Sequence, residues 1–419
     1  MKESELAWVG PIPPQWHRQP LKTLFHQHKK KNRGLVETNL LSLSYGRIVR
    51  RDINQRGGLL PESFEGYNIV SDGDIVLRLT DLQNDQKSLR TGLVREKGII
   101  TSAYITLRAN YSINTDYFQA LLESYDYKKV FYSMGGGVRQ GLNYDDISSL
   151  SLLVPPASEQ DAIADFIYYK KSEIDRLIEK LRRQVELLEQ YRRELIAHTV
   201  THGLDPDVPM RDSGIDWIGE TPSTWKTASI SLVTDENRAK NVDLLEKNLL
   251  SLSYGQIIRK DIDLAFGLLP ASFDSYQIVE PGNIILRMTD LQNDKRSLRS
   301  ALAKERGIIT SAYIGLKVRG PIISEYLAWL LRFYDLTKVF YSLGGGVRQS
   351  ASYKEIGKIP ILVPPMEEQQ KIADFLEEKS TQIDSTIEGI NRQIELLSKY
   401  RKQVINDAVT GKVRVGEVA

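Results

Sequence analysis

A direct repeat dominates this sequence. The segment that begins at position 77 returns at position 286, 209 residues later, with almost the same residues. LRLTDLQND at 77–85 returns as LRMTDLQND at 286–294, and LSLSYGRIVRRDI at 41–53 returns as LSLSYGQIIRKDI at 250–262. The same offset holds without a gap along nearly the whole chain of 419 residues. An internal repeat decides the architecture before any single motif does, so we interpret the chain as two copies of one unit.

The composition limits the class of protein. A chain of 419 residues exceeds what one hydrophobic core usually serves, and its 26% charged and 41% hydrophobic residues are typical of a soluble protein. The chain has no cysteine, which excludes disulfides, thiolate metal sites and a cysteine nucleophile, and suits a reducing cytoplasm. The N-terminus has no apolar signal-peptide core and no run of about eighteen apolar residues occurs, so we expect a cytoplasmic protein without membrane contact.

Within each copy, the part before the paired prolines predicts a mixed α/β domain. The segments 75–79 and 100–107 are rich in β-branched residues and are bounded by turn-forming residues, so each predicts a strand. The segment 114–133 predicts a helix that stops at the three glycines after it. A short strand then ends at Pro155 and Pro156, which prevent a helix from extending backwards.

A long helix is predicted after the prolines. No glycine or proline occurs from 157 to 202, and apolar residues recur there in alternating steps of three and four, as in Ile167, Ile174, Leu177 and Leu181. The second copy repeats the pattern, so each copy predicts a coiled-coil helix. At 1.5 Å per residue such a helix would be roughly 60 Å long, far more than one small domain needs.

Connectivity predicts the architecture of the whole chain. The second helix can return along the first, which gives two globular α/β domains separated by two antiparallel coiled-coil helices, with a pseudo-two-fold axis. The N-terminal tryptophan segment should then lie beside the end of the second helix, as residues 210–225 should lie beside the end of the first. The predicted parts are a first domain at 1–156, a helix at 157–201, a second domain at 202–365, a helix at 366–411 and a tail at 412–419.

A protein with two-fold symmetry and two separated sites suits duplex DNA that is read as two half-sites. A symmetric protein partner would fit the same geometry. The formal net charge of +2 is too small to identify a nucleic-acid binder, although basic clusters occur at 26–33 and 47–56. A basic run is also expected on an ordinary solvated face.

The junctions between domain and helix resemble a known family. The pattern V-P-P-x-x-E-Q-x-x-I-A-D-F, at 154–166 and again at 363–375, is similar to the junction of specificity subunits of type I restriction-modification systems. The linker at 201–225 and the GGGVRQ segment before each junction resemble the same family, and the resemblance covers the whole chain. The N-terminal segment at 5–8 departs from the corresponding part of the second copy.

The resemblance implies partners and a division of labour. Two target-recognition domains would bind double-stranded DNA, and the chain would assemble with two modification subunits that methylate adenine with S-adenosylmethionine. Restriction subunits that use ATP and Mg would translocate and cleave the DNA. The resemblance implies no catalysis and no cofactor in this chain.

The residues agree with a non-catalytic chain. It has no N-P-P-[FY] methylation motif and no G-x-x-x-x-G-K-[ST] phosphate loop. Asp72 and Asp74 could suggest a metal site, but the corresponding segment of the second copy, 280–283, keeps only one carboxylate, which favours a charged turn. Two alternatives stay open: a DNA-binding enzyme with an unrecognised active site, and a coiled-coil scaffold without DNA affinity. The five histidines lie in the first copy, where none has a histidine mate: His17, His26, His28, His198 and His202.

Candidate DNA contacts lie in three repeated segments. Glutamine and asparagine can pair with adenine, aspartate can accept from cytosine, and arginine and backbone amides can bind phosphate. Each segment also has a structural explanation: an Asp/Asn turn, a glycine helix stop or a solvated arginine. The candidates are Tyr45, Arg47, Arg50, Arg78, Thr80, Asp81, Gln83, Asn84, Arg139 and Gln140, with their repeat mates Tyr254, Gln256, Arg259, Arg287, Thr289, Asp290, Gln292, Asn293, Arg348 and Gln349.

The duplication of these segments predicts the form of the target. Both domains should read the same half-site, inverted by the two-fold axis, which is an interrupted palindrome. Arg47 against Gln256 is the main exception. Arginine favours guanine and glutamine favours adenine, so the halves would differ if this position reads a base.

Overall fold

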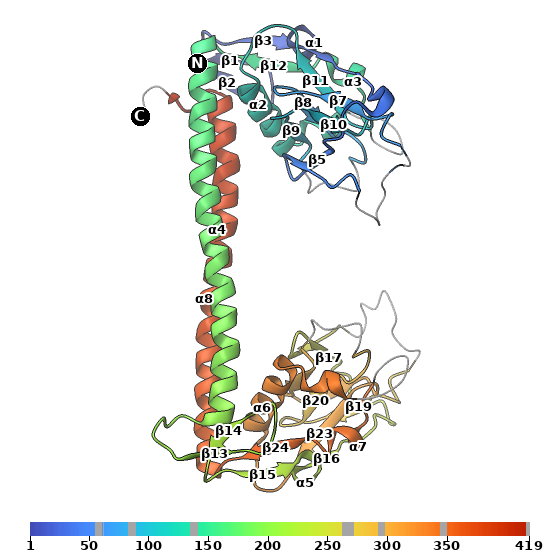
Figure 1. Cartoon of the computed structure of the whole chain (residues 1–419), viewed down its shortest axis with the longest axis vertical. Helices are drawn as coiled ribbons and strands as arrows, with labels where there is room; N and C mark the ends of the chain where they lie inside the picture. The colour runs from blue at the N-terminus through green and yellow to red at the C-terminus, as the bar shows by residue number, and fades with distance from the viewer. Residues whose placement is uncertain are drawn as a thin grey trace. The chain divides into compact units, whose positions relative to one another are not determined.

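The computed structural model forms two compact units (Figure 1). Unit 1 comprises Met1–Arg182 with Asn391–Ala419, and unit 2 comprises Arg183–Ile390. Both boundaries lie inside the two long helices, α4 (Ala157–His202) and α8 (Met366–Val409), so each unit contains a segment of both. The residues that the structure describes are 1–54, 61, 63–82, 89–134, 141–261, 272–291, 298–343 and 350–415.

The core of unit 1 is an antiparallel sheet of four strands in the order β4–β11–β8–β9. Four pairs of short strands surround it: β1 with β2, β3 with β12, β5 with β6, and β7 with β10. The strands are β1 Lys2–Glu3, β2 Pro11–Ile12, β3 His17–Pro20, β4 Phe25–Gln27, β5 Leu41–Ser44, β6 Arg47–Arg50, β7 Asn68–Val70, β8 Ile75–Leu77, β9 Thr91–Leu93, β10 Gly98–Ile100, β11 Ile105–Ala109 and β12 Ser151–Val154. The shorter helices are α1 Leu21–Leu24, η1 Arg33–Leu35, α2 Thr115–Tyr127, η2 Val130–Ser133 and α3 Tyr144–Ser148.

Two predicted elements are each divided in the structure. The strand predicted at 100–107 is wrong as one element, because β10 ends at Ile100 and a turn closed by the Tyr104 amide and the Thr101 carbonyl precedes β11. The helix predicted at 114–133 ends at Tyr127, because Lys129 has a left-handed φ of 59° that interrupts it before η2. The start of α2 follows from its cap, since the Asn114 side chain accepts from the Tyr117 amide at 3.0 Å.

Unit 2 repeats this arrangement, with a sheet of order β16–β23–β20–β21 that corresponds to β4–β11–β8–β9. Its strands are β13 Met210–Asp212, β14 Glu220–Pro222, β15 Lys226–Ser229, β16 Thr234–Glu236, β17 Leu250–Ser253, β18 Gln256–Arg259, β19 Gln277–Val279, β20 Ile284–Leu286, β21 Ser300–Leu302, β22 Gly307–Ile309, β23 Ile314–Val318 and β24 Pro360–Val363. Its shorter helices are α5 Ile230–Val233, α6 Ser324–Leu336, η3 Val339–Ser342 and α7 Tyr353–Ile356. The two copies of the sequence repeat therefore have the same internal structure, one in each unit.

Each unit buries the end of one long helix in its core. In unit 1, Ile405 and Val409 of α8 are fully buried in one cluster with Trp16. In unit 2, Ile196 and Val200 of α4 are buried with Trp225. The prediction that each tryptophan segment lies beside the end of a helix is thereby confirmed.

The same tryptophans also bind the start of the other helix. The Trp16 indole donates to Glu159 in the first turn of α4 at 2.7 Å, and the Trp225 indole donates to Glu368 in the first turn of α8 at 2.9 Å. Further along the helices, Arg401 pairs with Asp175 in unit 1. The α4 and α8 segments of unit 1 therefore run in opposite directions, and an Arg192–Asp384 ion pair joins the corresponding segments of unit 2.

The predicted division of the chain into five parts stays a prediction, since it follows sequence order while the compact units divide inside the helices. Among the residues that the structure describes, no helix combines the length and the apolar character that a membrane span requires.

Candidate nucleic-acid interface

An exposed tyrosine occupies the tip of the same hairpin in both units. Ser44 pairs with Arg47 across β5 and β6, which leaves a turn of two residues, Tyr45 and Gly46, with φ of 47° and 77°. Two positive φ angles are the signature of a type I′ turn, which normally takes asparagine, aspartate or glycine. Tyr254 has a φ of 46° at the tip of β17–β18, and the two tyrosines are 81% and 83% exposed. Packing in the fold does not account for a large aromatic side chain at this position.

The predicted DNA contacts Arg50 and Arg259 each bind a carboxylate of their own domain. The Nε atom of Arg50 donates to both oxygens of Glu96, at 2.8 and 2.9 Å, and Arg259 makes the same bidentate contact with Glu305. These hydrogen bonds hold the pKa of Glu96 and of Glu305 below the usual range. The pairs tie β6 and β18 to the turns before β10 and β22, so a DNA phosphate would compete with a carboxylate for these arginines.

The hairpin is anchored differently in the two units. In unit 1, Nη2 of Arg47 donates to Asp175 of α4 at 2.8 Å, and Asp175 also pairs with Arg401 of α8. Gln256 replaces Arg47 in unit 2 and cannot form an ion pair. There the partly buried Arg332 of α6 donates to the Gly255 carbonyl at the hairpin tip and to the Ser300 carbonyl. The one predicted difference between the two sites is therefore also a difference in how the hairpin is held.

A buried arginine that the sequence did not reveal lies beneath the repeated Thr-Asp-Leu segment. Arg90 is fully buried, and its guanidinium donates to the carbonyls of Thr80, Arg78 and Asp81 at 2.7, 3.3 and 3.3 Å. Its Nε donates to the Tyr132 hydroxyl at 3.3 Å. The only sequence signal is a Leu-Arg pair that recurs directly before β9 and β21. An arginine in such a pair would by itself be expected to be exposed.

Unit 2 contains the same network. Arg299 is fully buried and donates to the carbonyls of Thr289, Arg287 and Asp290 at 2.8, 3.1 and 3.2 Å. Its Nε donates to the Tyr341 hydroxyl at 3.2 Å. The backbone of the predicted contact segment is thus held by the same side chain in each domain.

The hairpin tip and the Thr-Asp-Leu segment are neighbours in unit 1. A Cβ atom on Gly46 would lie 2.8 Å from Leu89, the residue before Arg90. The Leu142 amide donates to the Leu79 carbonyl at 2.8 Å, so the chain after the GGGVRQ segment also returns to this place. The Ala351 amide makes the corresponding bond in unit 2. The predicted contacts Gln83, Asn84, Arg139, Gln140, Gln292, Asn293, Arg348 and Gln349 lie outside the described residues.

The proposed charged turn at Asp72 and Asp74 is supported by its contacts. Asp74 is buried and accepts two hydrogen bonds from Arg108, each 2.7 Å long, and one from the Ser71 amide. Within the described ranges, no three His, Cys, Asp or Glu side chains are grouped so that they could hold a metal ion.

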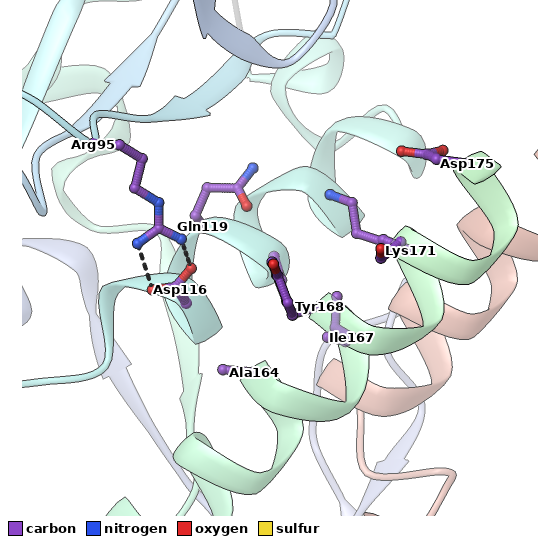
Figure 2. A pocket seen from close by; sticks show the side chains of 10 residues that line it. Arg95, Asp116, Gln119, Ala164, Ile167, Tyr168, Lys171 and Asp175 are labelled. Carbon is purple, nitrogen blue, oxygen red and sulfur yellow. Dashed lines mark hydrogen bonds and ion pairs between the residues drawn. The ribbon is translucent and has the colours of Figure 1, made fainter. Parts of the chain in front are cut away.

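A cavity of about 250 Å³ in unit 1 lies between α2, the turn after β9 and α4 (Figure 2). Arg95 and Asp116 form an ion pair across its edge, and Lys171 of its wall donates to Glu123 at 2.9 Å. Asp175, at the far end of the cavity, accepts from Arg47. These charged groups of the cavity are thus already paired within unit 1. The cavity is therefore a gap between the domain and α4, and the described residues that line it offer no unpaired charge to a ligand.

Comparisons with known proteins show which family the chain resembles. Residues 306–396 match the sequence model of the type I restriction modification DNA specificity domain. A Methanocaldococcus jannaschii protein that is named as the specificity subunit of type I restriction enzyme MjaX is 23% identical over 431 aligned positions, which cover 97% of this chain and 96% of that protein. The MjaVIII specificity subunit of the same organism is 24% identical over 365 positions, covering 83% and 80%. Over nearly its whole length the chain is thus similar to specificity subunits of type I restriction enzymes.

Solved structures show the fold of the chain. A chain from a structure that concerns complex assembly and conformational transition of the type I R-M system superimposes with a TM-score of 0.68 at 14% identity, covering 96% of the present chain and 100% of that chain. The HsdS subunit from Thermoanaerobacter tengcongensis gives a TM-score of 0.52 at 14% identity, covering 96% and 98%. The predicted mixed α/β fold with two domains and long helices is thereby confirmed.

Proposed function

We propose that this chain is a type I specificity subunit and that it binds a bipartite DNA site, with one half-site read by each globular domain. The observation that carries the proposal is the pair of exposed tyrosines, Tyr45 and Tyr254, at equivalent left-handed hairpin tips. A side chain in this conformation costs about 1 kcal/mol relative to glycine, so its presence at both tips favours a role in contact with a ligand. Tyrosine offers DNA an aromatic face and a hydroxyl that donates to phosphate oxygen.

The two half-sites are the same sequence in inverted orientation. Both domains present the same tyrosine, the same Thr-Asp-Leu segment and the same buried arginine beneath it. The exception is Arg47, which Gln256 replaces in the second copy. Arg47 binds Asp175, and this contact explains its presence without a role in reading a base. The candidate contacts that lie outside the described residues belong to the same duplicated segments.

The long helices bind the modification subunits. Leu187 and Tyr191 of α4 are exposed, and so are their repeat mates Leu396 and Tyr400 of α8. Residues four apart lie on the same face of a helix, so each pair forms one apolar patch, and exposed apolar patches mark protein interfaces. A double variant, Leu187→Glu with Leu396→Glu, should lose co-purification with the modification subunits while its circular dichroism spectrum stays that of the wild type.

The chemistry belongs to the partner subunits. S-adenosylmethionine is bound by the modification subunits, while ATP and Mg are used by the restriction subunits. The complex acts in the cytoplasm, and the specificity subunit contributes sequence recognition without catalysis. Purified alone, the chain should neither methylate nor cleave DNA; either activity would show that it is an enzyme.

The experiment is a methylome. The chain is produced with its modification subunit in a host without adenine methylation, and the DNA is sequenced by a method that detects methyladenine. The expected result is one motif with two identical inverted halves and an unspecified spacer. Absence of any defined motif would contradict the proposed function, and unlike halves would contradict only the palindrome. Salt-insensitive or absent duplex binding by the assembled complex would instead favour a scaffold.

Tyr45→Gly and Tyr254→Gly test the hairpin tips. Glycine relieves the left-handed strain, so the folded domain should be as stable as the wild type or slightly more stable. Methylation at the motif should nevertheless fall, because the DNA loses a contact at one half-site. Unchanged methylation in the double variant would show that the tips do not touch DNA.

A further inference from the structure

We propose that Arg90 and Arg299 are positioning residues for DNA recognition, each of which holds the Thr-Asp-Leu segment of its domain in the one backbone shape that reads the half-site. The inference rests on the proposed function, and it concerns side chains that do not themselves reach DNA. Both arginines are fully buried.

The burial of these cations requires a structural reason. A buried charge is costly unless its hydrogen-bonding groups are satisfied, and arginine has five donors in a planar fork. Arg90 directs this fork to three backbone carbonyls of residues 78, 80 and 81 and to the Tyr132 hydroxyl. Hydrogen bonds to three carbonyls within four consecutive residues fix the shape of the backbone there. A smaller apolar core residue could not form them.

The segment held in this way is strained. Asp81 and Asp290 have left-handed φ angles of 56° and 58°, and the carbonyl of each accepts from the buried arginine of its domain. A strained backbone persists only where its surroundings over-determine it, and such places concentrate at functional sites. The arginine therefore fixes the backbone at Asp81 or Asp290, the first residue of the repeated DLQND sequence.

The network also ties this point to α2, which packs against β9. The Arg90 amide donates to buried Asp126 at the end of α2 at 2.7 Å, and the Lys129 amino group lies 4.3 Å from the Tyr132 ring centre. Tyr132 in turn lies beneath the Arg90 guanidinium. A displacement of the Thr-Asp-Leu segment would therefore require α2 and η2 to move with it.

The two domains keep this network although they differ directly beside it. Glu123, three residues before Asp126 on α2, corresponds to Arg332 on α6, which reverses the charge. Glu123 binds Lys171 of α4, whereas Arg332 binds carbonyls of the β17–β18 hairpin and β21. The arginine network is thus the same in both domains, although the packing around it differs. This is expected if the network serves the site that the domains share.

Arg90→Lys tests the inference in the full chain assembled with its modification subunits. Lysine keeps the charge but replaces the planar fork by a single ammonium group. In the methylome assay, Arg90→Lys should give a motif in which one half accepts substituted bases at least tenfold more often, while the other half stays as in the wild type. Arg299→Lys should relax one half in the same manner, and the double variant both halves.

Tyr132→Phe is the milder second variant, which keeps the arginine and removes one acceptor. It should relax the same half as Arg90→Lys by a smaller factor, and it decides the question if Arg90→Lys fails to assemble. A lower methylation level with an unaltered motif would overturn the inference, because it would indicate a purely structural role, and so would an unchanged methylome. Failure of the proposed function is distinguishable, since the wild type itself would then give no motif.

Discussion

Ile405 lies near the end of the sequence, after the whole second domain, yet the structure places it in the core of unit 1. It is fully buried, in one cluster with Trp16 and the strands of the first sheet. Ile405→Ala should therefore destabilise unit 1 and leave unit 2 nearly unchanged.

The magnitude follows from the burial. The substitution removes about three carbon groups, each worth about 0.8 kcal/mol when buried. The remaining cavity adds to this loss, and buried isoleucine to alanine changes cost about 2–5 kcal/mol in total. We expect about 3 kcal/mol, which corresponds to about a hundredfold change in an equilibrium constant.

Hydrogen exchange measured by mass spectrometry resolves the two units in one sample. Amides of β8 and β11 exchange through unfolding of unit 1, so their exchange should become about a hundredfold faster in Ile405→Ala. Amides of β20 and β23 in unit 2 should exchange as in the wild type. The repeat mate gives a matched control, because Ile196 of α4 is buried in the core of unit 2 and Ile196→Ala should produce the opposite pattern.

Faster exchange of β20 and β23 in Ile405→Ala would refute the reasoning, because it would assign the end of α8 to the domain that precedes it in sequence. Equal acceleration in both sheets would show that the two units do not unfold separately.

Three further predictions concern single side chains. Burial raises the pKa of Asp126 from 3.8 to about 6, so between these pH values the folded chain binds more protons than the unfolded chain, and stability falls as pH rises through them. Urea unfolding should show that Asp126→Asn removes this loss of stability. The same slope of stability against pH in the variant and the wild type would contradict the prediction. Arg47→Gln breaks an exposed ion pair with Asp175, so it should change stability by at most about 1 kcal/mol and leave the methylated motif unaltered; one changed base in the motif would show that Arg47 reads DNA. Glu159→Ala leaves the buried Trp16 indole without its acceptor and should destabilise unit 1 by about 1–3 kcal/mol, measured by tryptophan fluorescence.

The features that could be predicted from the sequence are those that follow from periodicity and connectivity. The 209-residue offset appears without any knowledge of packing, and two long helices of opposite direction require the tryptophan segments to meet the helix ends. The contact of Trp16 with the end of α8 follows from that requirement alone. These inferences hold because they depend on chain length and repeat spacing rather than on individual side-chain energies.

The features that could not be predicted depend on partners remote in sequence. The sequence shows Arg50 only as a basic residue, because its partner Glu96 lies 46 residues away along the chain and meets it only in the fold. Arg90 has no local signal for burial, since its acceptors are carbonyls whose position depends on the left-handed turn at Asp81. Lys129 likewise divides a helix whose residue pattern continues through it, because tertiary contacts override local propensity.

The exception to the repeat has a structural explanation that favours the palindrome. In unit 1 the tyrosine hairpin is tied to α4 by Arg47, and in unit 2 it is tied to α6 by Arg332, whose repeat mate Glu123 binds α4 instead. Each domain therefore has one arginine that anchors the hairpin, but from a different position in the sequence. If the purpose of both is to hold an exposed tyrosine at the same place, then replacement of Arg47 by Gln256 is compensated within unit 2 and need not alter the base that is read. The domains differ in how they support the recognition surface, while the residues proposed to form that surface are duplicated.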